Sequence, residues 1–321
     1  MNILIVKLSS LGDVVHAMPA VQDLLAAVPG AQVDWVVERA FAPLVERCAG
    51  VRRVIPCALR KWRKAPLAAG TRAEWGAFRA QLQAQPYDAV LDLQGLTKSA
   101  IVARVARLAP GGRRYAMANR TEGSSYEAPT RWLADVAVPV TVQSHAMQRS
   151  RELCARALGY AVPARLRHGL GRAGGAREPT VVFVHGSSRD DKLWPADHWV
   201  ALGRRLLAQG LDIALPHGSE VELARSERLA AALGPRARVW PRLALDQLVD
   251  RMAGCRGAIG VDSGLSHIAV ALDLPHVQIY NFDTAWRTGP IGQARQVAVV
   301  ARPTPAVDAV WQAWTAVAGA A

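Results

Sequence analysis

Short apolar runs alternate with stretches of helical period along most of the chain. The clearest apolar runs, which predict strands, cover residues 3–8, 33–38, 88–93, 180–186, 212–218, 257–262 and 277–280. Amphipathic stretches over residues 19–28, 74–85, 198–210 and 223–234 predict helices between them. Strands that alternate with helices at this spacing are typical of βα units and parallel sheets. The pattern therefore predicts an α/β fold.

The segment Arg165–Pro179 interrupts this alternation, because it is rich in glycine and has no apolar run. A new βα pattern starts at Thr180, and a length of 321 residues suits two domains. We expect two doubly wound domains, 1–168 and 179–305, that face each other across a cleft. In such sheets ligands bind outside the carboxyl ends of the strands, so the loops that follow the strands deserve the closest inspection.

Composition narrows the class of protein. Hydrophobic residues make up 51% of the chain and charged residues 20%, as in globular proteins, and no apolar run is long enough to span a membrane. We expect no signal peptide. The four cysteines, at 48, 57, 154 and 255, form no C-x-x-C pair, so we expect reduced thiols in a cytoplasmic protein, with neither a zinc site nor a disulfide.

The net charge of +13 concerns the partners. A strongly basic chain suits nucleic acid, acidic lipid or a phosphorylated sugar. Plain arginine usage in the genome explains the charge equally well.

The loop after the first predicted strand, KLSSLGD, contains an acid in this basic protein. It matches neither the G-x-G-x-x-G fingerprint nor a P-loop. Ser9 or Ser10 suits a helix cap, and Gly12 allows close backbone approach. Asp13 then falls in the first helical turn, where the helix dipole favours its ionised form. Two interpretations fit Asp13: a carboxylate that only stabilises the helix start, or a general base in the cleft.

Three loops in the second half of the chain are suited to bind a nucleotide. Ser187 and Ser188 follow a strand and precede Lys192, so hydroxyls, amides and a cation are available for phosphate oxygens. A later strand runs into Asp262, Ser263 and Gly264 at a helix start, with His267 one turn further. Asp262 suits a cap there, and the amides of Ser263 and Gly264 suit a phosphate. Glu222 follows another strand and suits ribose hydroxyls. A solvated lysine, a structural histidine and a charged helix start are the alternatives.

Basic residues gather in the first half of the chain. The stretch from Leu59 to Arg72 holds Arg60, Lys61, Arg63, Lys64 and Arg72 without any acid. Lys98 and Arg120 lie in later loops of the same half. A nucleic-acid surface, a clamp for an acidic acceptor and a solvated face all fit this pattern.

Together, four blocks resemble the ADP-heptose:lipopolysaccharide heptosyltransferases, glycosyltransferase family 9, over nearly the whole chain. They are ILIVKLSSLGDVVHAMPAVQDL, SSRDDKLWPADHW, LPHGSEVE and GVDSGLSHIAVALDLP. The resemblance implies a GT-B fold, with two Rossmann-like domains facing across a cleft. The N-terminal domain would bind the acceptor and the C-terminal domain the nucleotide sugar. In GT-B enzymes the last helix usually packs on the N-terminal domain, so we expect this of residues 306–318, with Trp311 and Trp314 for docking.

The opening and the basic stretch are most similar to the branch that adds the first heptose to Kdo of the lipopolysaccharide inner core. The resemblance thus implies an inverting transfer of L-glycero-D-manno-heptose from ADP-heptose to Kdo2-lipid A. Asp13 matches the position of the family's catalytic base. The implied donor-binding residues are Ser187, Ser188, Lys192, Glu222, Asp262, Ser263, Gly264 and His267. The implied acceptor-binding residues are Ser10, Gly12, Arg60, Arg63, Lys64, Lys98 and Arg120.

The chain contains no Asp-x-Asp, so we expect no bound divalent metal and no cofactor, with Lys192 and backbone amides in place of a cation. We also expect a monomer at the cytoplasmic face of the inner membrane. The segment NFDTAWRTGPIG departs from the family pattern, and Thr284, Trp286 and Arg287 receive no role. The alternatives are the branch that adds the second heptose, a sugar-nucleotide epimerase of the same fold, and a nucleic-acid-binding module.

Overall fold

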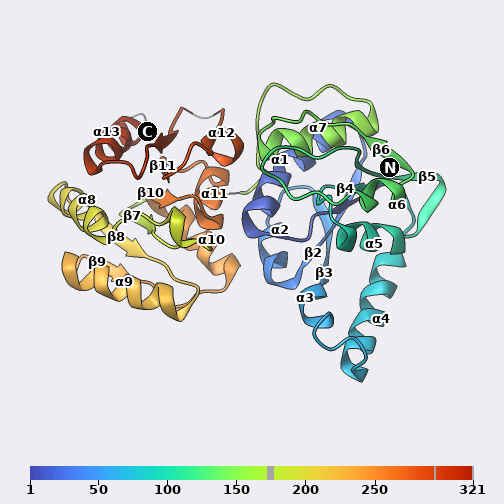
Figure 1. Ribbon diagram of the computed structural model, residues 1–321, viewed down its shortest axis with the longest axis horizontal. Helices are drawn as coiled ribbons and strands as arrows, with labels where there is room; N and C mark the ends of the chain where they lie inside the picture. The colour runs from blue at the N-terminus through green and yellow to red at the C-terminus, as the bar shows by residue number, and fades with distance from the viewer. Residues whose placement is uncertain (172–176, 293, 320–321) are drawn as a thin grey trace. The chain divides into compact units, whose positions relative to one another are not determined.

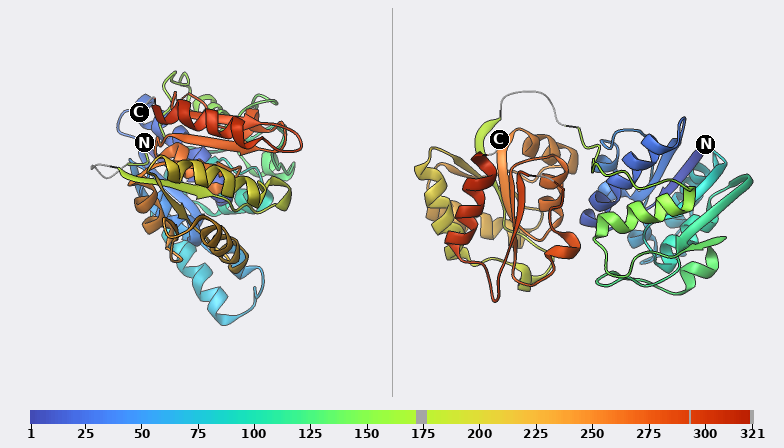
Figure 2. Two further views of the ribbon diagram at one scale, coloured as in Figure 1. Left: turned by 90° about the vertical axis from the view of Figure 1, so that its left-hand side faces the viewer. Right: turned by 90° about the horizontal axis from the view of Figure 1, so that it is seen from above.

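The computed structural model describes residues 1–171, 177–292 and 294–319, and it divides into two compact units, Met1–Gly169 and Leu170–Ala321. We call them the N-terminal and C-terminal domains. The predicted linker, Arg165–Pro179, spans this division, although its residues 172–176 lie outside the described part. Each domain is a parallel six-stranded sheet with helices on both faces (Figures 1 and 2).

The N-terminal sheet has the strand order β3-β2-β1-β4-β5-β6. Strand β1 lies between β2 and β4, with Ile3 opposite both Val33 and Ala89. The elements of this domain are β1 (Asn2–Val6), α1 (Leu11–Ala27), β2 (Gln32–Glu38), η1 (Arg39–Phe41), α2 (Ala42–Val45), β3 (Val51–Cys57), α3 (Leu59–Trp62), α4 (Ala69–Gln83), β4 (Tyr87–Asp92), α5 (Thr97–Val105), β5 (Leu108–Met117), α6 (Pro129–Leu133), β6 (Val136–Val138) and α7 (Ala146–Leu158).

The C-terminal sheet repeats this topology, with the order β12-β11-β10-β7-β8-β9. Its elements are β7 (Glu178–Val184), η2 (Asp190–Lys192), α8 (Ala196–Ala208), β8 (Asp212–Leu215), α9 (Glu220–Leu233), β9 (Ala237–Val239), α10 (Leu245–Ala253), β10 (Cys255–Val261), α11 (Gly264–Ala271), β11 (His276–Tyr280), α12 (Ala285–Thr288), β12 (Gln296–Val300) and α13 (Val307–Gly319). In both sheets the strand order reverses beside the first strand, at β1/β4 and at β7/β10. At such a switch point the neighbouring loops separate to opposite faces and leave room for a ligand.

All seven predicted strands and all four predicted helices are present. The sequence pattern missed five strands, β3, β5, β6, β9 and β12. Strand β3 carries Arg52 and Arg53 at the sheet edge, where both guanidinium groups pair with the buried Asp34. Strand β5 contains Gly111 and Gly112, which are unusual in strands. Polar edge positions in β3 and glycines in β5 therefore interrupt the apolar pattern of these two strands.

The last helix, α13, packs on the sheet of its own domain. The buried face of α13, Val310, Trp314 and Val317, lies in the core of the C-terminal domain with Phe183 and Trp199. Trp311 packs against the same core, and Asp308 forms an ion pair with Arg205 of α8 at 2.6 Å. The apolar face of residues 306–318, which we expected to pack on the N-terminal domain, thus contributes to the core of the C-terminal domain.

The four cysteines are buried and free, as expected from their spacing. Among the residues described, no helix is both long and apolar enough to cross a membrane.

A buried histidine gives the C-terminal domain a pH dependence. His276 of β11 is 0% exposed, and its Nδ1–H donates to the carbonyl of Ala258 at 2.9 Å. Burial lowers the pKa of His276 to about 4. The unfolded chain therefore takes up a proton first as the pH falls, and stability is lost between about pH 6.5 and pH 4.

We predict that His276→Asn, which retains a donor for Ala258, reduces the loss of stability on acidification. Linkage assigns this one histidine about 2 kcal/mol between pH 7 and pH 5. Thermal unfolding of both proteins across that range measures the difference. Parallel curves of melting temperature against pH for variant and wild type would contradict the assignment.

Candidate functional site

The start of α1 places Asp13 at the switch point of the N-terminal sheet. Ser10 is the N-cap residue, and Asp13 lies in the first turn, as the sequence predicted. The Asp13 carboxylate accepts hydrogen bonds from the backbone N–H of Ser10 at 2.9 Å and from its hydroxyl at 2.8 Å. The side chain of Asp13 is therefore fixed by its own loop and stays partly exposed.

Charged side chains from distant parts of the chain surround this carboxylate. We call Lys7, Asp13, Asp92 and Arg149 the N-terminal charge cluster. Lys7 is 3% exposed and donates from Nζ to the backbone carbonyl of Leu93 at 2.9 Å. Arg149, on α7, is also buried and donates to the hydroxyl of Thr121 at 3.1 Å.

The pKa values of the two carboxyl groups in this cluster shift in opposite directions. Burial alone would raise the pKa of Asp13, but the charge of Lys7, the hydrogen bonds from Ser10 and the charge of Arg149 together lower it. Asp13 is therefore ionised at neutral pH. Burial raises the pKa of Asp92 to about 6, despite hydrogen bonds from Gln94, Ser99 and Gly95. Burial also lowers the pKa of Lys7.

Sequence reasoning missed three members of this cluster. Lys7 directly follows the apolar strand β1, and a lysine in that position is itself a signal of a functional site. Asp92 ends β4, the strand next to β1, and no pattern in the sequence reveals that adjacency. Arg149 comes from α7, which packs on α1 through the buried ion pair of Arg151 and Asp23. Only the fold brings Arg149 to the site.

The predicted acceptor-binding residues follow several strands of the same sheet. Gly12 is in the first turn of α1, and Arg120 follows β5. Arg60 lies in the first turn of α3 after β3, and Lys98 lies in the first turn of α5 after β4. Because the sheet is parallel, these positions share its carboxyl edge. The buried Glu38 at the end of β2 accepts a hydrogen bond from the N–H of Arg60 at 3.2 Å, and the charges of Arg60 and Lys98 both act on it. Arg63 and Lys64 lie further out, in the exposed connection to α4.

Three loops meet at the switch point of the C-terminal sheet. We call the segments 185–192, 216–222 and 262–267 the donor loops, because they contain the residues that the sequence predicts for donor binding. Ser187 donates a hydrogen bond from its hydroxyl to the backbone carbonyl of Asp262 at 3.3 Å, which joins the loops after β7 and β10. Ser188 is exposed beside it. The predicted residues of these two loops are thus brought together.

Lys192 and Asp262 form an ion pair within the donor loops. Lys192 Nζ donates to Asp262 Oδ2 at 2.6 Å, while His267 Nε2 lies 3.4 Å from Oδ1 of the same carboxylate. Burial alone would raise the pKa of Asp262, but His267 and Lys192 lower it well below its usual range. The carboxylate therefore orients Lys192 and His267 at neutral pH.

The helix start after β10 differs in detail from the prediction. Ser263, not Asp262, is the N-cap residue of α11. The carboxylate of Asp262 instead pairs with Lys192. The hydroxyl of Ser263 is buried and has no hydrogen-bond partner among the described residues. Gly264 begins the helix. An unsatisfied hydroxyl at a helix N-terminus suits an anionic ligand oxygen.

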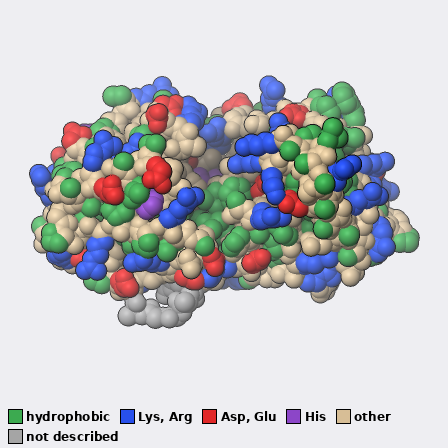
Figure 3. Space-filling model, turned by 90° about the horizontal axis from the view of Figure 1, so that it is seen from below, with side chains coloured by type: hydrophobic (Ala, Val, Ile, Leu, Met, Phe, Trp, Pro, Cys, Tyr) green, Lys and Arg blue, Asp and Glu red, His purple; other side chains and the backbone are tan. Residues whose placement is uncertain are grey.

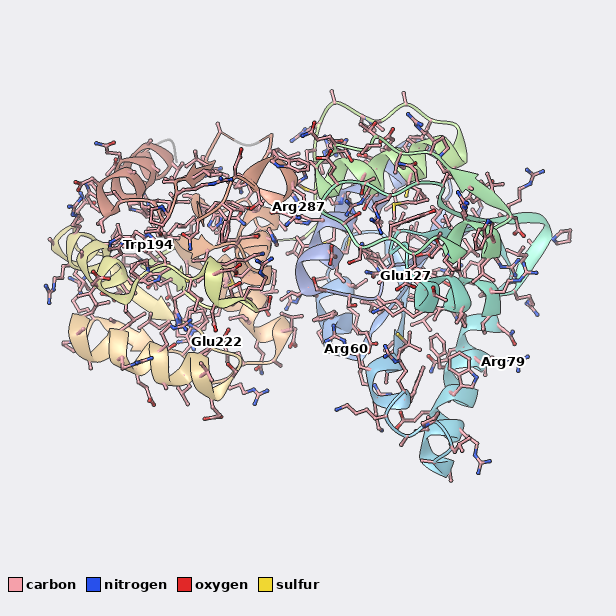
Figure 4. The ribbon with its side chains drawn as sticks, in the orientation of Figure 1. Arg60, Arg79, Glu127, Trp194, Glu222 and Arg287 are labelled. Carbon is pink, nitrogen blue, oxygen red and sulfur yellow. The ribbon has the colours of Figure 1, made fainter. Side chains whose placement is uncertain are left out.

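Glu222 lies where the loops after β7 and β8 approach each other. Its carboxylate accepts a hydrogen bond from the N–H of Gly218 at 2.7 Å. A Cβ at Gly186 would lie 2.4 Å from Glu222 Oε1, so the carboxylate occupies the space that this glycine leaves free. Figure 4 labels Glu222 near the start of α9. Its place at two strand ends suits a pair of ribose hydroxyls.

Thr284 and Arg287, which received no role, belong to α12 and its cap. The neighbouring Thr288 donates a hydrogen bond to Asp262 Oδ1 at 3.4 Å and contacts the hydroxyl of Tyr280. The segment that departs from the family pattern therefore supports Asp262 from a further side. Within the described ranges, no group of three or more histidine, cysteine or acidic side chains is arranged to hold a metal ion.

Two doubly wound parallel sheets with polar loops at their switch points define a two-domain Rossmann-like protein of the GT-B type, and the predicted fold class is confirmed. Residues 75–310 match the family model of glycosyltransferase family 9 (heptosyltransferase). The chain belongs to this family and is a glycosyltransferase.

Curated relatives and solved structures agree with this assignment. Lipopolysaccharide heptosyltransferase 1 of Escherichia coli K12 is 40% identical over 307 residues, which are 92% of this chain and 93% of the relative. Lipopolysaccharide heptosyltransferase 2 of the same strain is 26% identical over 318 residues, with 92% and 87% covered. The solved structure of E. coli heptosyltransferase WaaC with ADP superimposes with a TM-score of 0.87, at 37% identity, with 97% of this chain and 98% of that chain covered.

Proposed function

We propose that this protein transfers L-glycero-D-manno-heptose, with inversion, from ADP-heptose to Kdo of the lipopolysaccharide inner core. The observation that carries the proposal is the ionised, loop-anchored Asp13 at a switch point, in a chain 40% identical to a lipopolysaccharide heptosyltransferase 1. The lower identity to heptosyltransferase 2, 26%, favours Kdo over heptose as the acceptor.

Asp13 is proposed as the general base. Its carboxylate would accept the proton of the attacking Kdo hydroxyl as the new glycosidic bond forms at C1 of the heptose. The charge of Lys7, the hydrogen bonds from Ser10 and the charge of Arg149 lower the pKa of Asp13. The carboxyl group therefore stays ionised in the free enzyme. An anionic acceptor beside Lys7 and Arg149 would offset part of their charge and strengthen Asp13 as a base. The carboxylate would also stabilise positive charge on the heptose ring.

The donor loops are proposed to bind ADP-heptose. Lys192, Ser187, Ser188 and the helix start at Ser263 and Gly264 would stabilise the negative charge on the departing ADP. Glu222 would accept hydrogen bonds from the ribose hydroxyls, and His267 would add a donor beside Lys192. In this scheme Lys192 supplies the cation for the diphosphate, so we expect turnover to persist when EDTA removes divalent metals.

The basic residues of the N-terminal domain are proposed to bind the acceptor. Arg60, Arg63, Lys64, Lys98 and Arg120 offer guanidinium and ammonium groups for the Kdo carboxylates and lipid phosphates. The net charge of +13 favours approach to this polyanion and to an anionic membrane surface.

An ADP-release assay with two acceptors tests the proposal. Purified protein with ADP-heptose should release ADP when Kdo-lipid A is added, and not without an acceptor. Heptosyl-Kdo-lipid A should support at most a small fraction of that rate. Faster release with the heptosylated acceptor would assign the protein to the second transfer instead, and ADP release independent of any acceptor would overturn the proposal.

A further inference from the structure

The connection between α3 and α4 is the most exposed segment of the N-terminal domain's described chain. Residues 63–70 are all exposed, and Leu67 has 84% of its surface accessible. We call Arg63–Arg72 the α3–α4 tip. Figure 1 shows it projecting away from the N-terminal sheet. An aliphatic side chain so exposed at the end of a projection has no role in the core.

An apolar pocket of about 270 Å³ lies directly beside the tip. Leu59, Trp62, Pro66 and Trp75 supply its apolar walls, and Arg63 and Arg72 also line it. Its base is rigid, because Trp62 and Trp75 pack edge to face at 5.5 Å and both contact Phe78. The volume is near the lower end of ligand pockets, roughly 300–1,000 Å³.

The charge around this pocket is predominantly positive. Between Leu59 and Gln83 the chain has six basic residues and one acid, Glu74. Both oxygens of Glu74 are already engaged, by Lys61 at 2.5 Å and by Trp62 Nε1 at 2.8 Å. Figure 3 views the molecule from the side on which α3 and α4 project, and there Lys and Arg side chains border exposed apolar ones. The pocket is thus suited to an apolar group attached to an anion.

This combination distinguishes between possible partners. Single-stranded nucleic acid is bound by exposed aromatic faces, whereas Trp62 is only 6% exposed. Interfacial segments that bind anionic bilayers combine aliphatic side chains, which enter the acyl region, with lysines and arginines at the level of the phosphates. The α3–α4 tip has the same combination: its aliphatic side chains are Pro66 and Leu67, and its basic ones are Arg63, Lys64 and Arg72.

We propose that the α3–α4 tip docks the protein on an anionic phospholipid bilayer, with Leu67 inserted among the acyl chains and one phospholipid chain in the pocket beside Trp75. Arg63, Lys64 and Arg72 then contact lipid phosphates. The inference rests on the proposed function in that the acceptor is a lipid in the same bilayer. The other end of α3 is fixed to the carboxyl edge of the sheet, where Glu38 accepts from Arg60. Docking by the α3–α4 tip therefore places the bilayer surface at one end of α3, and the proposed acceptor-binding residue Arg60 lies toward the other end.

Vesicle sedimentation without any acceptor tests the docking. The wild type should bind vesicles of phosphatidylethanolamine and phosphatidylglycerol and not vesicles of phosphatidylcholine. Leu67→Glu should weaken that binding about tenfold or more, since it puts a charge in place of the aliphatic group that enters the acyl chains on docking. Val142→Glu, at a site 51% exposed in the loop before α7, is the matched control and should bind like the wild type. Equal binding by Leu67→Glu and the wild type would overturn the proposal.

A second variant addresses the pocket. Thr71→Trp fills the pocket without removing Leu67 or a charge, because Thr71 is one of its lining residues. It should weaken vesicle binding several-fold. Wild-type binding by Thr71→Trp would overturn the assignment of an acyl chain to the pocket.

Activity on two forms of the acceptor separates docking from catalysis. Leu67→Glu should release ADP at the wild-type rate with a fully deacylated, water-soluble acceptor, and should be slower with the acceptor embedded in vesicles. Loss of both activities in Leu67→Glu would overturn the docking role. If the wild type lacks transferase activity but binds vesicles in a way that depends on Leu67, the docking proposal stands and only the proposed function is overturned.

Discussion

Asp13→Asn should lower turnover by about 100-fold to 10,000-fold while ADP still binds with nearly the wild-type affinity. The amide has nearly the shape of the carboxylate and still accepts from Ser10, but it cannot take a proton from the acceptor hydroxyl. Because Asp13 and the donor loops belong to different domains, the variant leaves Lys192 and its partners unchanged. Steady-state ADP release and calorimetric titration with ADP measure the two effects separately.

The control for Asp13→Asn is another carboxylate in a first helical turn. Asp246 lies in the first turn of α10, away from the donor loops in sequence. Asp246→Asn loses a comparable helix-dipole contribution, about 0.3–1 kcal/mol, and should keep wild-type turnover. Turnover by Asp13→Asn within a few-fold of the Asp246→Asn rate would contradict the assignment of Asp13 as the base.

Lys192→Ala should have the second-largest effect, with donor affinity lowered by about tenfold to 100-fold and turnover lowered as well. The side chain is expected to contact the diphosphate both when the donor binds and when ADP departs. Its removal also leaves Asp262, which is 5% exposed, without its closest partner. A buried carboxylate that loses its cation destabilises a fold, so the melting temperature should fall too.

The double variant Lys192→Ala/Asp262→Asn separates these two effects. Neutralising Asp262 removes the unpaired charge and should restore most of the melting temperature. Donor affinity should remain low, because the cation for the diphosphate is still missing. If the double variant recovers wild-type affinity for ADP, Lys192 only balances Asp262 and has no part in binding the donor.

The sequence predicted the parts of the fold that depend on local pattern. Apolar runs such as residues 3–8 and 257–262 form buried strands. The polar residues that follow them gather at one edge of each sheet, because the carboxyl ends of parallel strands share that edge. Asp13 and Ser10 at a helix start, and Ser187 near Asp262, follow from the same rule.

Pairings across the fold could not be predicted in this way. Arg149 reaches the N-terminal charge cluster because α7 packs on α1. The buried ion pair that joins these two helices connects Asp23 and Arg151, which are 128 positions apart. Asp262 was expected to cap a helix but pairs with Lys192 instead, and this pairing depends on a contact between the loops of neighbouring strands. The position of α13 depends on which apolar surface its residues complete, which periodicity does not specify.

Mass spectrometry of the acceptor after incubation with ADP-heptose tests the central claim most directly. We expect the wild type to add one heptose, and only one, to Kdo2-lipid A, and Asp13→Asn under the same conditions to leave the acceptor almost unmodified. An unmodified acceptor after incubation with folded wild-type protein, or equal product from both proteins, would contradict the proposed function.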